Sequence, residues 1–329
     1  MTSHNGSTST DREAAEADAR RKHLTVSVGL VLLASIVYVG VALFTLPDLP
    51  GMVATHFDAT GRADGFMPTR PALLMQGAFV IGVPVALLLV LVAGQAWRGA
   101  NARAFSATLA GLTAGLTTLF VSSTVIQVGV TDAADVTLRG SVALLALGVA
   151  ALVGLASALV LPRPLPRRAA EVVVPMTIGP SDRVSWFGRA HMSQGALAML
   201  ALSVLVVALA AMGSGIAWLW LLVLLLVILV LGMTSFAVTI DGHGVSWRAA
   251  LGVPRGRVKL TDITAVAVTE VSFGDFGGFG VRALPGRLGL ITRSGSALQV
   301  THGKRELVIT VDDAHTAASV VEGLRRARG

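Results

Sequence analysis

The stretch Leu24–Leu46, which reads LTVSVGLVLLASIVYVGVALFTL, decides the class of this fold. It contains no charged residue. It is also longer than the roughly 20 apolar residues that a helix needs to cross about 30 Å of hydrocarbon. The sequence therefore predicts a membrane-spanning helix at these positions.

Three basic residues, Arg20, Arg21 and Lys22, directly precede this run, as they would in a secretory signal peptide. The apolar region of a signal peptide is only about 7–15 residues long, and a small-residue cleavage site follows it. This run is longer and has no clear A-x-A site after it. We therefore interpret it as a retained spanning helix.

Further apolar runs make the chain a polytopic membrane protein of about six spans. They cover residues 73–97, 104–128, 138–161, 194–211 and 216–233. Only 14% of the 329 residues are charged, compared with about 25% in a typical soluble domain. This deficit indicates that much of the surface faces lipid. Only Met212–Gly215 separates the last two runs, which predicts a tight helical hairpin.

These runs divide the chain into five parts, and we expect the first of them to fray. The parts are a polar N-terminal tail (1–22), a four-helix membrane domain (23–161) with an outer loop at 47–71, a cytoplasmic linker (162–193), a membrane helical hairpin (194–233) and a cytoplasmic domain (234–329).

The distribution of Lys and Arg predicts the orientation, because cytoplasmic loops retain positive charge. With the N-terminus inside, the outer segments hold only Arg62, Arg70 and Arg139. The inner segments before the last two spans hold eleven: Arg12, Arg20, Arg21, Lys22, Arg98, Arg103, Arg163, Arg167, Arg168, Arg183 and Arg189. We expect a multi-pass protein of the cell membrane with both termini in the cytoplasm.

From about Thr234 the apolar pattern changes to a period of two, which is typical of strands. FAVTID and GVSWRAAL flank Gly242 and His243, a signal for a hairpin. About seven short strands are expected, followed by a terminal helix that Asp312 or Asp313 can cap. The predicted class is an α-helical membrane bundle joined to a small antiparallel α+β domain.

The outer loop carries a motif as well as turn residues. It contains Pro50, His56, Asp58, Gly61, Asp64 and Phe66, and these six residues carry the resemblance that follows. With the two helices around it, roughly residues 25–100, this loop resembles the domain-of-unknown-function 1648 family. That family includes relatives of the immunity protein of the sporulation-delaying toxin system. The resemblance implies a membrane-embedded protective, sensing or regulatory role.

The C-terminal part, about 234–329, is similar to bacterial pleckstrin-homology-like domains. That resemblance implies a partly open antiparallel barrel with a C-terminal helix. Many eukaryotic relatives bind phosphoinositides through basic residues of the first hairpin. Here that hairpin is Asp241–Gly244 and has neither Lys nor Arg, which argues against phosphoinositide binding.

Five residues of the outer loop are the candidate ligand-binding residues: His56, Asp58, Gly61, Asp64 and Phe66. In one interpretation, His56, Asp58 and Asp64 hold zinc or manganese, which accept such ligands. In the other, the two aspartates bond to their own backbone, and Gly61 and Gly65 provide turn conformations. An EF-hand is excluded, because Arg62, Ala63 and Thr69 occupy positions that need other residue types.

Three further groups of residues have a possible role. Ala107, Gly111 and Gly115, spaced four apart, would let two helices approach closely. Arg255, Arg257 and Lys259 form a basic segment that either contacts an anionic membrane surface or is simply solvated. The glycine-rich stretch 273–286 is expected to be a strand connection with its phenylalanines in the core.

No catalytic signature is present, so we expect a non-enzymatic protein without a cofactor. The chain has no cysteine, which excludes disulfides, cysteine nucleophiles and iron–sulfur clusters. The expected partners are the lipid bilayer, an envelope peptide or protein at the outer loop and a cytoplasmic protein at the C-terminal domain; no nucleic acid is expected. A transporter or channel, with Gln76, Thr113, Thr117 and Gln127 as polar lining, and an outward-facing metal-dependent enzyme remain as alternatives.

Overall fold

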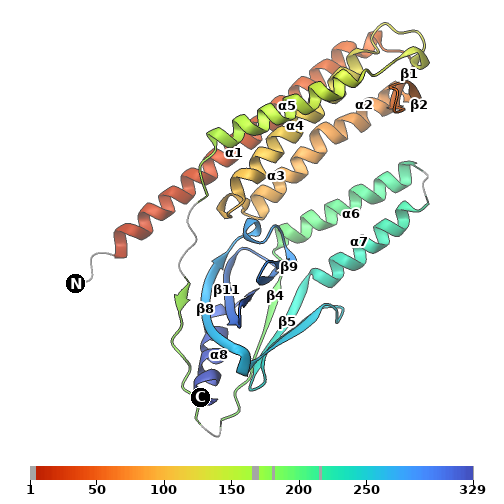
Figure 1. Ribbon diagram of the computed structural model, residues 1–329. Helices are drawn as coiled ribbons and strands as arrows, with labels where there is room; N and C mark the ends of the chain where they lie inside the picture. The colour runs from red at the N-terminus through yellow and green to blue at the C-terminus, as the bar shows by residue number, and fades with distance from the viewer. Residues whose placement is uncertain (1–4, 165–169, 180–181, 215–216, 329) are drawn as a thin grey trace. The chain divides into compact units, whose positions relative to one another are not determined.

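A computed structural model describes residues 5–164, 170–179, 182–214 and 217–328 (Figure 1). The chain divides into two compact units. The first comprises Met1–Val92 and Ala102–Pro164, and the second comprises Ala93–Asn101 and Leu165–Gly329. The second unit therefore includes a short segment from the first third of the chain.

The first unit is a bundle of helices that lie alongside one another, as Figure 1 shows. Its helices are α1 (Asn5–Thr45), α2 (Thr69–Gly77), the π-helical turn η2 (Ala78–Gly82), α3 (Val83–Ala93), α4 (Ala102–Val125) and α5 (Gly140–Val160). Because α2, η2 and α3 are continuous, the described residues contain four helices long and apolar enough to cross a membrane. The polar residues 5–22, expected to fray, are the first turns of α1.

The small residues of α4 face α5. A methyl group added at Gly111 would lie 2.6 Å from the backbone oxygen of Ala150, and one at Gly115 would lie 2.9 Å from the Ala150 side chain. From the other helix, a methyl group at Gly154 would lie 3.2 Å from the oxygen of Ala107. Without larger side chains between them, the two backbones pack directly against each other.

Two further apolar helices belong to the second unit, α6 (Gln194–Ser214) and α7 (Leu219–Met233). At 1.5 Å per residue, the 15 residues of α7 extend only about 22 Å. Membrane crossing by this pair stays a prediction. The pair is inserted between strands β4 (Trp186–His191) and β5 (Ser235–Asp241), which are antiparallel neighbours. The start of α6 and the end of α7 therefore lie side by side.

The rest of the second unit is built from two sheets and a helix. A four-stranded sheet has the order β4-β5-β6-β7, and a six-stranded sheet has the order β3-β8-β11-β12-β10-β9. The remaining elements are β3 (Glu171–Val172), β6 (Gly244–Ala249), β7 (Arg255–Lys259), β8 (Ile263–Val271), β9 (Gly280–Leu284), β10 (Arg287–Ile291), β11 (Gly295–His302), β12 (Arg305–Thr310) and α8 (Ala314–Arg328). The main core lies between the sheets and α8.

Several expectations for this unit are confirmed, and others are corrected. The hairpin at Gly242 and His243 is present, with Asp241 opposite Gly244. The Asp313 carboxylate accepts the Thr316 amide at 3.0 Å and so caps α8. The linker, however, supplies β3 and β4 to the sheets. One pair, β10 and β12, is parallel rather than antiparallel, because β11 reverses the chain between them.

The first half of the glycine-rich stretch connects β8 to β9, whereas its second half is strand β9 itself, so the expected connection is shorter than predicted. Its Phe276 is buried in a second small core. The same stretch contacts the segment Ala93–Asn101. The Ala100 amide donates to the Asp275 carboxylate at 3.1 Å, and the side chain of Asn101 donates to the oxygen of Gly274 at 3.0 Å. A short segment before α4 is thus part of the β-rich unit.

Candidate functional site

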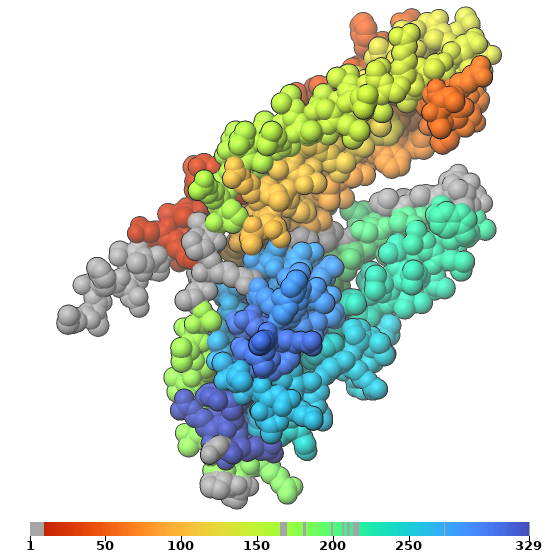
Figure 2. Space-filling view, viewed as in Figure 1, coloured from red at the N-terminus to blue at the C-terminus, as the bar shows by residue number. Residues whose placement is uncertain are grey.

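The predicted outer loop folds into a two-stranded hairpin, β1 (Met52–Phe57) and β2 (Ala63–Pro68). Figure 2 shows its surface in orange at one end of the helices. The Asp58 carboxylate closes the turn by accepting the amides of Thr60 at 2.8 Å and Arg62 at 3.0 Å. The Thr60 hydroxyl and then the Arg62 amide hold the pKa of Asp58 below its ordinary value.

Gly61 is required in this turn for two reasons. Its φ of +85° lies in the left-handed region, which favours glycine. In addition, a side chain here would collide with the backbone oxygen of Leu138. The predicted turn roles of Asp58 and Gly61 therefore match their positions in the hairpin.

His56 and Asp64 form a pair on the exposed face of the hairpin. The Nδ1 atom of His56 lies 2.5 Å from the Oδ1 atom of Asp64. Gly65 is opposite His56, and a methyl group on it would lie 2.8 Å from the His56 Cβ atom. Met52 and Phe66 are also exposed, at 46% and 41% of their surface. The hairpin therefore presents an apolar surface next to a polar pair.

The outer edge of β1 is attached to the bundle through Gln127. This side chain is buried after the end of α4. It accepts the Ala54 amide at 2.7 Å and donates to the Ala54 oxygen at 3.1 Å and to the Ser123 oxygen at 2.8 Å. Gln127 thus satisfies the backbone of β1 as a neighbouring strand would, and the sequence analysis did not identify this role.

The loop between α4 and α5 completes the surface. The Leu138 amide donates to the Gly61 oxygen at 2.8 Å, and Arg62 and Thr137 form an isolated bridge. The short helix η4 (Ala133–Asp135) follows Asp132, whose carboxylate accepts the Ala134 amide at 2.9 Å. We call residues 52–68 together with 132–138 the hairpin platform.

The metal interpretation receives no support from this geometry. Asp58 is bonded to its own turn, whereas His56 and Asp64 are bonded to each other. Within the part of the chain that the structure describes, no group of three His, Asp or Glu side chains is arranged to hold a metal ion. What the platform offers chemically is an exposed surface with charged, polar and apolar groups.

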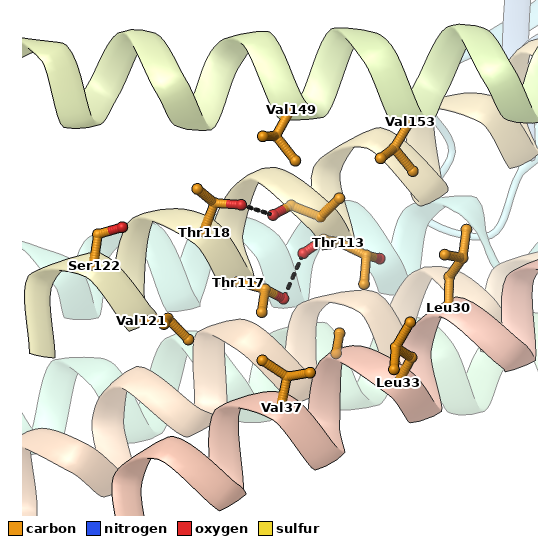
Figure 3. Close-up of a pocket in the computed structure, with 12 residues that line it drawn as sticks. Leu30, Leu33, Val37, Thr113, Thr117, Thr118, Val121, Ser122, Val149 and Val153 are labelled. Atoms are coloured by element: carbon orange, nitrogen blue, oxygen red, sulfur yellow. Dashed lines mark hydrogen bonds between the residues drawn. The ribbon is translucent and has the colours of Figure 1, made fainter. Parts of the chain in front are cut away.

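The candidate polar lining of the bundle divides into two groups. Gln76 is buried and accepts the Thr124 hydroxyl at 3.0 Å, which connects α2 to α4. Thr113 and Thr117 lie along a groove of about 380 Å³ between α1, α4 and α5 (Figure 3). The Thr117 and Thr118 hydroxyls donate to backbone oxygens of their own helix at 2.7 and 2.9 Å. The rest of the groove is mostly apolar.

The predicted basic residues Arg255, Arg257 and Lys259 alternate along β7 and are exposed. Opposite them on β6, the register places Arg248 beside Arg255 and Ser246 beside Arg257. The sequence analysis identified only the residues on β7. The cross-strand neighbours could not be assigned before the sheet register was known.

Comparison with known proteins gives one match. Residues 31–80 match the model of a family described as a domain of unknown function, DUF1648. This range covers about the last third of α1, both strands of the hairpin, all of α2 and the start of η2. No curated protein and no solved structure matched the chain.

Proposed function

We propose that this chain is a non-enzymatic, multi-pass protein of the cell membrane that recognises a cationic amphipathic peptide of the envelope at its hairpin platform. In this proposal α6 and α7 also cross the membrane, and both termini are cytoplasmic. The C-terminal domain, which we assign to the pleckstrin-homology-like class, faces a cytoplasmic protein. A protective, sensing or regulatory role follows from such an arrangement.

The attachment of the platform to the bundle is the observation that carries this proposal. Gln127 and the Leu138 amide hold the hairpin at two places. Met52 and Phe66 of the hairpin nevertheless stay exposed. An exposed apolar surface on a hairpin that the rest of the protein holds in place is typical of an interaction site. A preorganised surface also loses less conformational entropy when a ligand binds.

The charge of the platform supports a cationic ligand. Its exposed carboxylates belong to Asp58, Asp64, Asp132 and Asp135, whereas Arg62 is its only arginine. Acidic groups around an apolar patch complement a peptide that has one basic and one apolar face, and such complementarity also speeds association.

The groove in Figure 3 does not favour the alternative of a transporter. A solute path needs polar groups directed into it. The hydroxyls of Thr117 and Thr118 instead donate along their own helix, and most of the lining is aliphatic. The groove suits an acyl chain or a packed helix better than a hydrated solute.

The test uses the full chain in nanodiscs of neutral phosphatidylcholine, so that a cationic peptide is not drawn to the lipid itself. The probe is a fluorescent model peptide of leucine and lysine with an amphipathic helical pattern. We expect saturable binding to the wild type. Phe66→Ala and Asp64→Asn should each weaken peptide binding about tenfold, which corresponds to about 1.4 kcal/mol of binding free energy.

Asp262→Asn, an exposed aspartate after β7, is the matched control and should bind like the wild type. Equal peptide binding to all four proteins, or to empty discs, would disprove recognition at the platform. In cells, the same variants should fail to restore peptide tolerance to a deletion strain, whereas Asp262→Asn should restore it.

A further inference from the structure

The outward face of the β4-β5-β6-β7 sheet is basic across several strands. The register aligns Arg189 with Ala237, Ala237 with Arg248, and Arg248 with Arg255, which makes one row over four strands. Arg257 and Lys259 extend the basic surface along β7. All five cationic side chains belong to exposed residues, whereas alternate positions on these strands face the core.

The positive charges on this face repel one another, and a bound anion would remove that repulsion. Arg248 and Arg255 lie directly opposite each other on neighbouring strands, and like charges in that relation destabilise a pair of strands. Among the described residues, no carboxylate forms an ion pair with any of the five cations. Arginine forks match the geometry of phosphate oxygens.

A hollow of about 550 Å³ lies on the same face. Ala237, Thr239 and Ser246 form part of its lining, together with Arg248, Arg255 and Arg257. These small residues leave space between the arginines, and the hydroxyls add hydrogen-bonding groups. Several phosphate groups side by side would fit such a surface better than one small anion would.

The row lies close to the ends of the apolar helices. His191 pairs with Ser235, and the Met192 amide donates to the oxygen of Thr234 at 3.0 Å, just before α6 and just after α7. Arg189 and Ala237 are only two residues further along their strands, or about 7 Å. Any membrane that contains the ends of α6 and α7 therefore has its headgroups at this row.

The loop between β6 and β7 adds an apolar tip at the same level. The Ala250 amide donates to the oxygen of Ser235 at 3.0 Å, and Leu251 lies next to Gly232 in the last turns of α7. Leu251 and Val253 are nevertheless 58% and 74% exposed. Exposed aliphatic residues beside cations are typical of a surface that enters the headgroup region.

We propose that this face docks on anionic phospholipids of the leaflet that α7 enters. The arginines bind the headgroup phosphates, and Leu251 and Val253 insert among the first methylene groups. The docking fixes the orientation of the β-rich unit at the membrane surface. The inference rests on the proposed function in one respect, which is that α6 and α7 lie in the membrane.

The experiment uses the full chain in nanodiscs and benefits from the absence of cysteine in the sequence. A bimane probe at Val253→Cys reports collisions with lipids that carry a nitroxide at the headgroup. We expect quenching to rise when phosphatidylglycerol replaces part of the phosphatidylcholine. It should fall again at about 1 M salt, where the Debye length is about 3 Å.

The double variant Arg248→Gln/Arg255→Gln lacks two positive charges. Its equilibrium constant for docking should be about 30-fold lower than that of the wild type, or about fivefold per charge. Lys304→Gln/Arg305→Gln, at the turn between β11 and β12, is the matched control and should behave like the wild type. If phosphatidylglycerol does not change the quenching, or if the two variants respond alike, docking on anionic lipid is disproved. An acidic protein would then be the occupant to consider.

A second probe separates this inference from the proposed function. Leu224→Cys lies within α7 and should be quenched by nitroxides deep in the acyl chains, whatever the lipid charge. Quenching at Leu224 without a charge-dependent signal at Val253 overturns the docking alone. No quenching at Leu224 overturns the membrane hairpin and the docking together.

Discussion

At the scale of single residues, one glutamine determines how the hairpin is held. Gln127 supplies both hydrogen bonds that the buried backbone of Ala54 lacks on that side. Its side chain is 1% exposed, so water cannot replace it. An unpaired buried backbone group costs about 1–3 kcal/mol.

We therefore expect Gln127→Leu to loosen the hairpin while the helices remain intact. Amide hydrogen exchange in residues 52–68 should become at least about tenfold faster, consistent with the loss of roughly 2 kcal/mol. Gln194→Leu, at the exposed start of α6, is the control. Unchanged exchange in the hairpin would mean that Gln127 does not hold it.

Glu322 is the residue through which pH should act on the second unit. Its carboxylate accepts two hydrogen bonds from Arg325, both 2.9 Å, and one from Arg326 at 3.0 Å. The Arg325 guanidinium, with Arg326, holds the pKa of Glu322 below its ordinary value of 4.5. The stabilisation is therefore complete above that value and is lost as the pH falls through the lowered pKa.

We expect amide exchange in α8 to accelerate below about pH 4.5 in the wild type. Because both arginines are partly exposed, the contribution at neutral pH is only about 1 kcal/mol. Glu322→Gln should lower the free energy of unfolding by that amount, and amide exchange in its α8 should depend less on pH. Asp262→Asn, which removes an exposed carboxylate, should keep the acid response of the wild type. An unchanged profile in Glu322→Gln would contradict the assignment.

At the scale of elements, the contact between α4 and α5 tolerates little added volume. A methyl group at Gly111 would already be 2.6 Å from a backbone oxygen, so the helices must separate to admit it. Overpacking typically costs about 1–3 kcal/mol. Gly111→Val should lower the thermal midpoint of the detergent-solubilised protein, measured by size-exclusion chromatography. Gly148→Val on α5, which meets nothing within 4 Å, should leave the midpoint unchanged.

Elements also show where sequence reasoning succeeded and where it failed. The four long helices and the β5–β6 hairpin follow from local periodicity, and the Asp313 cap follows from local chemistry. The platform depends instead on Gln127 and Ala54, which are 73 residues apart in the chain. No local pattern encodes such a pair. The linker strand β4 was likewise missed, because only its partner β5 makes it a strand.

At the scale of the whole molecule, the number of spans determines the side of the membrane on which each unit lies. In the proposed arrangement of six spans with a cytoplasmic N-terminus, the hairpin platform would lie outside and the β-rich unit inside, as the distribution of arginine and lysine predicts. In intact cells, an impermeant maleimide should label Thr131→Cys but should label Thr261→Cys only after permeabilisation. Labelling of Thr261→Cys in intact cells would instead mean an odd number of spans, with either α6 or α7 not crossing.

The segment Ala93–Asn101 has a consequence for the order in which the protein is completed. The Ala100 amide bonds to a carboxylate 175 residues later in the chain. At about 5–20 residues per second, a ribosome needs roughly ten to thirty-five seconds to synthesise that partner. During this interval the helices on both sides of the segment have already been synthesised, but the residues of the β-rich unit that the segment contacts have not. The nascent protein thus has a period in which a chaperone or a protease can reach Ala96 and Trp97, which are buried in the finished molecule.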